Sequence, residues 1–99
     1  MLVISGEIRV APESRGKMIE QAIIMAQATR TEAGCHAYSF YTDIEDPNVL
    51  RIFEEWESDA ALAAHFKAPH MAAYRAATKG LTVISRALKK YEIASASPL

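Results

Sequence analysis

The chain has 99 residues and a mass of 10.9 kDa, which suits one small domain and is too short for two. Its composition is 51% hydrophobic and 23% charged, as in ordinary globular proteins and unlike disordered chains. A net charge of -1 leaves no positive surplus to neutralise phosphates, so we expect no nucleic-acid partner.

The lone cysteine, Cys35, cannot form an internal disulfide, which is typical of a reducing compartment, so we expect a cytoplasmic protein. The first residues include no basic segment, and Glu7 and Arg9 interrupt the apolar stretch. That stretch is therefore too short for a signal peptide or a membrane span. We expect no membrane association and take Met1 as the beginning of the first strand.

The first strand is predicted over Leu2 to Val10, where β-branched residues alternate with polar ones. Pro12 suits the first position of a helix, because a proline there loses no needed N–H group. Apolar residues then recur at helical spacing to about Thr31, and Gly34 closes this helix.

The rest of the chain contains two aromatic or β-branched strands, two short helices and a final strand. Turn residues join the two middle strands as a hairpin, and Ser58 caps the helix that follows. Pro69 separates the short helices, because a proline cannot continue the first one but can begin the second. In chain order we predict strands over His36 to Asp43 and Leu50 to Glu57, helices over Ala60 to Lys67 and Pro69 to Lys79, and a strand over Leu81 to Ile93.

This order of elements is the ferredoxin-like α+β plan, βαββαβ, with one antiparallel sheet and the helices on one of its faces. We interpret residues 1–94 as a single domain and residues 95–99 as a loose polar tail. In the second strand Tyr38 and Phe40 point to one face and Tyr41 to the other. Since the helices cover only one face, we predict a homodimer that packs sheet against sheet.

Two residues are candidates for proton transfer. Glu54 shares a strand face with Trp56 and other apolar side chains, and burial there would raise its pKa. The alternative for Glu54 is a cross-strand ion pair with Arg9 or Arg86. His65 lies on an alanine-rich helix that leaves room for a ligand, and an imidazole suits a general base. The alternative for His65 is a structural histidine that is satisfied by a carbonyl.

Four aromatic residues are candidates for the walls of a pocket that holds a planar substrate, and the more ordinary role for each is packing in the core. They are Phe40, Trp56, Phe66 and Tyr74. Tyr74 could also donate a hydrogen bond to a substrate oxygen. His70 follows Pro69 at the start of a helix, where we expect it to be exposed or at a subunit interface.

Other reactive groups give no motif. Cys35 and His36 are neighbours on a strand and face opposite ways, so they do not form a nucleophile and base pair. The three histidines and the cysteine lack the spacing of common metal motifs, and no glycine-rich loop is present to bind a phosphate. We therefore expect neither a metal nor a cofactor.

Several segments, in this order and spacing, resemble the antibiotic biosynthesis monooxygenase domain. They are Glu32-Ala33-Gly34-Cys35-His36-Ala37-Tyr38, Asp43, Asp46-Pro47, Glu54-Glu55-Trp56, His65 and Pro69-His70. The resemblance extends from about Pro12 to Tyr91. It implies a dimeric α+β barrel with a pocket between the sheet and the helices of each subunit. Proteins of this family oxidise phenolic or quinol-like substrates with molecular oxygen and without a metal or flavin.

Similar domains break down haem or isomerise small metabolites, so the resemblance indicates the fold more narrowly than the reaction. The haem-degrading branch uses an asparagine on the first strand, where this chain has Gly6-Glu7-Ile8, and haem degradation is disfavoured. The leading hypothesis is a cofactor-independent monooxygenase that acts on a small aromatic or quinol-like substrate, with His65 or Glu54 as the base. The alternatives are a non-oxidative isomerase and a non-catalytic dimeric module that binds a small molecule.

Overall fold

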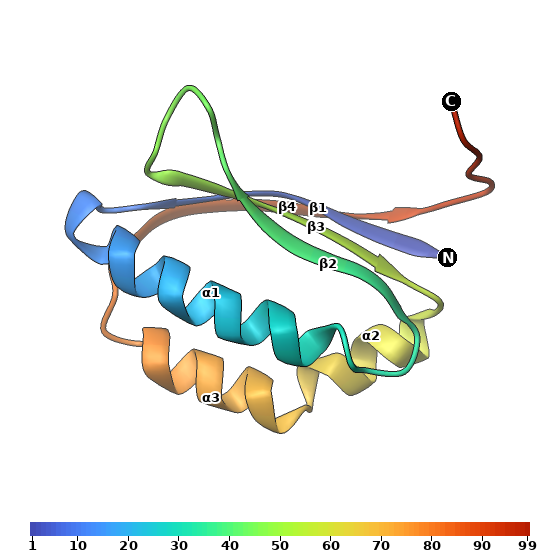
Figure 1. Cartoon of the computed structure of the whole chain (residues 1–99). Helices are drawn as coiled ribbons and strands as arrows, with labels where there is room; N and C mark the ends of the chain where they lie inside the picture. Colours follow the sequence, from blue (N-terminus) through green and yellow to red (C-terminus); the bar gives the residue numbers. More distant parts are fainter.

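The computed structural model describes residues 1–99 and contains one four-stranded antiparallel sheet with three helices on one face (Figure 1). The strands are β1 (Leu2–Val10), β2 (Cys35–Thr42), β3 (Val49–Trp56) and β4 (Val83–Glu92), arranged in the order β2-β3-β1-β4. The helices are α1 (Arg15–Thr29), α2 (Asp59–Phe66) and α3 (Pro69–Thr78). The predicted ferredoxin-like α+β fold is confirmed.

The elements begin and end close to the predicted positions. Pro12–Ser14 forms a separate 3-10 turn, so α1 starts at Arg15, a little later than the proline suggested. Gly34 has a φ of 81°, a left-handed conformation that glycine adopts without steric cost, and it turns the chain from α1 into β2. Ser58 caps α2, because its hydroxyl accepts a hydrogen bond from the backbone N–H of Ala61.

The strand register places Tyr38 opposite Glu54, and Glu54 opposite Ile4. Residues that are directly opposed lie on the same face of the sheet, so Tyr38, Glu54 and Ile4 share one face. This is the face that meets the helices. Two buried clusters pack between the sheet and the helices. The larger is Leu2, Met25, Ala26, Tyr38, Ile52, Trp56, Leu62 and Met71, and the smaller is Ile8, Val10, Met18 and Leu50.

At Gly6 the backbone of β4 lies close to that of β1. A Cβ atom built on this glycine would lie 2.0 Å from the carbonyl oxygen of Ala87 and 2.7 Å from the Cα atom of Leu88. Both contacts are with backbone, which cannot move aside as a flexible side chain can. The missing side chain at Gly6 therefore sets how closely β4 approaches the centre of the sheet.

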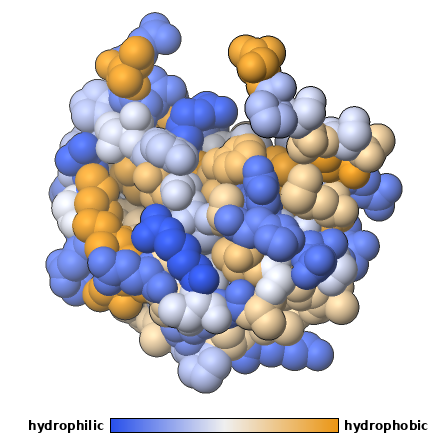
Figure 2. Space-filling view, turned by 45° about the vertical axis from the view of Figure 1, so that its right-hand side comes forward, coloured by the Kyte–Doolittle hydropathy of each residue, from blue (hydrophilic) through white to orange (hydrophobic).

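The other face of the sheet carries no helix (Figure 1). Val3 lies opposite Tyr91 on β4 and Glu55 on β3, so these three share that face, and Tyr91 is 45% exposed. Apolar side chains also lie among charged ones on the surface that Figure 2 shows. The sheet thus has apolar groups on both faces, while the homodimer inferred from them stays a prediction. None of the helices has the length and apolar character that crossing a bilayer requires.

Candidate active site

A cavity of about 530 Å³ opens between the helix-facing side of the sheet and the helices α2 and α3. Its lining is mostly apolar, with a few polar side chains, as in typical small-molecule sites. Most of the predicted site residues line it, namely Phe40, Glu54, His65, Phe66 and Tyr74. Residues that are distant in the sequence are therefore brought to one concave surface.

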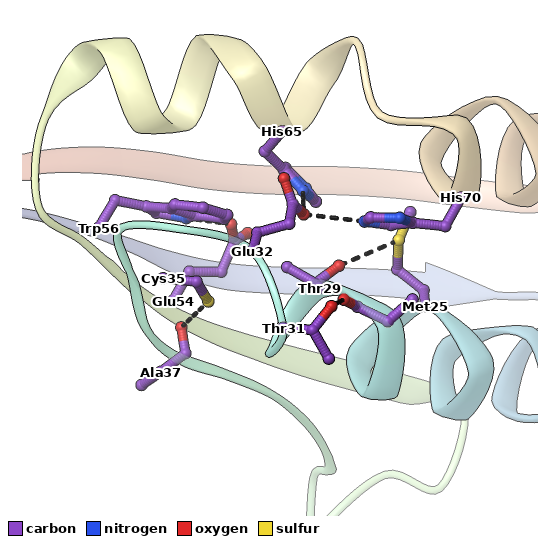
Figure 3. Close-up of polar contacts among 11 residues, drawn as sticks. Met25, Thr29, Thr31, Glu32, Cys35, Ala37, Glu54, Trp56, His65 and His70 are labelled. Carbon is purple, nitrogen blue, oxygen red and sulfur yellow. Dashed lines mark hydrogen bonds and ion pairs between the residues drawn. The ribbon is translucent and has the colours of Figure 1, made fainter.

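Trp56, expected as a wall of the pocket, lies instead behind it. Its side chain is fully buried in the larger core cluster, next to Leu62 of α2. The indole Nε1 donates a hydrogen bond of 2.8 Å to Oε1 of Glu54 (Figure 3). Trp56 ends β3, and its ring packs against that of His65 with the ring centroids 4.9 Å apart, so His65 lines the cavity and the indole does not.

Glu54 is a carboxylate on an otherwise apolar face, as the strand alternation predicted. The expected alternative, an ion pair with Arg9 or Arg86, is not present, because Arg9 pairs with Asp46 and Arg86 has no acidic partner. The Oε2 atom of Glu54 has no hydrogen-bond partner, although every fully buried side-chain nitrogen or oxygen has one. Oε2 is therefore accessible, and the surface that it reaches is the cavity.

Burial raises the pKa of Glu54 to about 6, and the nearby charge of Glu32 acts in the same direction. The hydrogen bond from Trp56 favours the carboxylate and opposes both effects. Desolvation is the larger influence because only 7% of Glu54 is exposed. A carboxyl group with this pKa is ionised at neutral pH and is a stronger base than an exposed glutamate.

His65 is almost wholly buried, with 1% of its surface exposed, between the rings of Trp56 and Tyr38. Its Nδ1 lies 2.6 Å from Oε2 of Glu32, so a carboxylate and not a carbonyl satisfies this histidine. A carboxylate can only accept, which makes Nδ1 the protonated nitrogen of a neutral ring. The lone pair of His65 is then on Nε2.

Glu32 also accepts a hydrogen bond from His70, whose Nε2 lies 2.8 Å from the same oxygen (Figure 3). His70 was expected to be exposed or at a subunit interface; 23% of its side chain is exposed, so it is not a fully exposed residue, and the interface position stays a prediction. Glu32 comes from the loop after α1, His65 from α2 and His70 from α3. One carboxylate therefore ties three segments together.

Glu32, His65 and His70 all lie in segments that carry the family resemblance, but no local spacing links Glu32 to the two histidines, so the sequence did not predict that they meet. Their ligand-type atoms all lie within 4.8 Å of one another, and two imidazoles with one carboxylate are a donor set that zinc uses. The separations of 2.6 and 2.8 Å are those of charge-assisted hydrogen bonds. These hydrogen bonds account for the cluster as it stands.

Two tyrosines, Tyr38 and Tyr74, also line the cavity. Burial raises the pKa of Tyr38, and the charge of Glu54 raises it further. Burial also raises the pKa of Tyr74, against the opposing charge of Arg86. Both phenols are therefore hydrogen-bond donors at neutral pH. The partner of Tyr74 in the protein is the weakly accepting Sδ of Met18, at 3.4 Å, so a substrate oxygen would be a better acceptor.

The sequence matches the family model "Antibiotic biosynthesis monooxygenase" over residues 1–77. The Escherichia coli protein named "Probable quinol monooxygenase YgiN" is 34% identical over 90 residues, which cover 81% of this chain and 86% of that protein. The uncharacterised protein sll1783 of Synechocystis is 32% identical over 98 residues, covering 99% of this chain and 67% of that protein.

Solved structures share the fold along the whole chain. A Deinococcus radiodurans protein of the same family superposes with a TM-score of 0.90 at 27% identity, covering 100% of this chain and 98% of that chain. Rv0793 of Mycobacterium tuberculosis gives a TM-score of 0.87 at 25% identity, with 98% of both chains covered. These likenesses support a monooxygenase-type function at the level of the family. The chain belongs to the antibiotic biosynthesis monooxygenase family.

Proposed function

We propose that this protein is a cofactor-independent monooxygenase that oxidises a small aromatic or quinol-like substrate with molecular oxygen. The observation that carries the proposal is the cavity in which the unpartnered oxygen of Glu54 lies among apolar and aromatic walls. The quinol named in the E. coli relative's description supports the substrate class.

In the proposed reaction a quinol and one O2 give a hydroxyquinone and one water. One oxygen atom enters the ring and the other leaves as water, and the substrate supplies all the electrons. The protein therefore has to remove a phenolic proton and hold the resulting anion where water is scarce. A cavity with mostly apolar walls meets the second requirement.

Glu54 is our first candidate for the base. It exposes 7% of its surface against 1% for His65, and Oε2 has no other partner to give up before it accepts a proton. His65 is the second candidate, because the hydrogen bond to Glu32 leaves its Nε2 unprotonated. Both residues line the same cavity, so one bound substrate could be deprotonated by either of them.

The aromatic residues would orient the substrate. Phe40 and Phe66 lie on the cavity walls and offer ring faces and edges to a planar molecule. Tyr74 would donate its hydroxyl proton to a substrate oxygen in exchange for its weak contact with Met18. This arrangement favours an aromatic substrate with oxygen substituents over an aliphatic one.

Labelled oxygen tests the proposal. The protein is incubated with a panel of hydroquinones under 18O2, and the products are analysed by mass spectrometry. We expect one 18O atom in each product molecule and one O2 consumed per turnover. Product without the label, or equal turnover in a sealed anaerobic vessel, would favour the isomerase. Tight binding of hydroquinones with no oxidation at all would favour the binding module.

A further inference from the structure

We propose that the cavity selects a hydroxylated aromatic compound that carries a carboxylate, and that Arg75, Lys79 and Arg86 form the subsite for this anionic group. The aromatic part of the ligand rests on the proposed function. The anionic part rests on a separate observation, the distribution of charge along the cavity wall.

Three cationic side chains line the outer part of the cavity. Arg75 lies on α3 and Lys79 directly follows this helix, one turn further along, so both are on the same side of it. Arg86 comes from β4, across the cavity from the helix. All three are exposed residues, which places them where the cavity meets solvent.

The same wall contains one acidic residue, Glu54, and it is buried. None of the three cations forms an ion pair within the protein. Several other basic side chains do, namely Arg9, Lys17, Arg51 and Lys90. The chain as a whole has a net charge of -1, so this excess of positive charge is local. A ligand with a negative group would supply the missing partner.

Arg86 has the most informative position. It lies opposite Ile8 in the register, so it stands on the helix-facing side of the sheet, among residues that are mostly apolar. Its charge is near enough to Tyr74 to oppose the rise of that residue's pKa. A cation that is directed to the cavity and lacks an acidic partner is a candidate for ligand recognition.

These positions make the two ends of the cavity chemically different. Glu54 lies at the buried end and would face the hydroxyl that is deprotonated, while the cations lie at the open end. The planar forks of two arginines match a carboxylate, which they can bind with paired hydrogen bonds. The preferred ligand is therefore an aromatic ring with a hydroxyl at one end and a carboxylate at the other.

Calorimetric binding of 4-hydroxyphenylacetate and of its methyl ester tests this subsite without turnover. The two ligands differ in charge and little in shape, and neither is a quinol, so the result does not depend on oxidation. We expect the wild-type protein to bind the acid about tenfold or more tightly than the ester, and added salt to reduce this ratio.

Arg86→Gln and Arg75→Gln should each lower the ratio of acid to ester affinity by about tenfold. Lys89→Gln is the matched control, because Lys89 is on β4 but lies opposite Ser5 on the face without helices. It should leave the ratio within about twofold. Arg75 lies on an exposed helix position, so its variant keeps the test valid if Arg86→Gln fails to fold.

Equal affinity of the wild-type protein for the acid and the ester would overturn the proposal. So would an equal loss in Lys89→Gln, because it would show a general effect of surface charge. If the subsite fails, the 18O2 result still decides the proposed function. If no quinol is oxidised, the calorimetry still decides the subsite.

Discussion

Oε2 of Glu32 lies 2.6 Å from Nδ1 of His65, although the two residues are 33 positions apart in the sequence. The same oxygen accepts from His70 at 2.8 Å. A carboxylate with two imidazole donors fixes the loop after α1 against α2 and α3. This contact has consequences for stability and for the protonation of both rings.

Removal of this carboxylate should destabilise the fold. Glu32→Ala leaves two largely buried imidazoles without their acceptor, so we expect the free energy of unfolding to fall by about 1–3 kcal/mol. Glu45→Ala, at an exposed hairpin position, should change it by less than about 0.5 kcal/mol. Urea unfolding measures both. Equal stability of the two variants would show that the contact contributes nothing.

The same contact predicts opposite tautomers for the two histidines. His65 donates from Nδ1 and His70 from Nε2, so each neutral ring should carry its proton on a different nitrogen. Nitrogen-15 NMR of the imidazoles at pH 8 distinguishes the two forms. Finding both rings in the same tautomer would contradict the assignment.

The activity of the protein should depend on the ionisation of Glu54. A base with a pKa of about 6 is active only when ionised, so kcat/KM for a quinol should rise with pH through about 6 and then level off. Glu54→Gln should lower turnover by about 10²- to 10⁴-fold and remove this rise. His65→Ala is the comparison: if it causes that loss while Glu54→Gln stays within a few-fold, His65 is the base.

Glu54 should also make stability depend on pH. Its pKa is raised from 4.5 to about 6 in the folded state, so its ionisation opposes folding. Below pH 4.5 Glu54 is protonated in both the folded and the unfolded state, and its contribution to the free energy of unfolding is fully present. This contribution is lost as the pH rises through about 6, where the folded protein also gives up the proton. That loss amounts to about 2 kcal/mol, which Glu54→Gln should not show. Denaturant titrations at pH 4 and pH 8 measure it, and parallel curves for both proteins would rule it out.

Replacement by alanine should change the stability of the protein in opposite directions at two glycines. Gly6→Ala would place Cβ against the backbone of β4, so we expect a loss of about 1–3 kcal/mol or a failure to fold. Gly16 lies in α1 with nothing within 4 Å of an added Cβ, so Gly16→Ala should stabilise the protein by about 0.5–1 kcal/mol. Thermal unfolding of the two variants measures both effects. Losses of equal size in Gly6→Ala and Gly16→Ala would contradict this prediction.

The uncovered face of the sheet predicts a homodimer. Light scattering at micromolar concentration should report about twice the chain mass of 10.9 kDa. Tyr91→Glu puts a charge on that face and should shift the mass toward the monomer, whereas Ile23→Glu, an exposed position on α1, should not. A wild-type monomer at this concentration would remove the sheet-to-sheet interface.

The sequence predicted the fold because its signals are local. Alternation over Leu2 to Val10, the cap at Ser58 and the break at Pro69 each depend on a few neighbouring residues. Strand alternation also placed Glu54 on the helix-facing side correctly. The element boundaries moved by one to three residues where a 3-10 turn preceded α1.

The cluster around Glu32 could not be predicted in the same way. It forms because a loop and two helices meet in space, and a single acidic residue in a loop gives no signal of its partners. For the same reason the sequence left His70 as either exposed or at a subunit interface, and Trp56 as either a cavity wall or a core residue. Whether that ring reaches the cavity or stays in the core depends on packing between elements, which periodicity does not report.

The hydrogen bond between Trp56 and Glu54 gives the protein an internal optical reporter. Trp56 is the one tryptophan of the chain, and its indole N–H contacts the carboxyl group whose pKa is about 6. The emission of this indole should therefore change as that carboxyl group gains a proton, with a midpoint near pH 6. A ligand that enters the cavity and displaces water from Glu54 should move this midpoint. Fluorescence alone can then report the charge state of the site, with no added dye and no turnover.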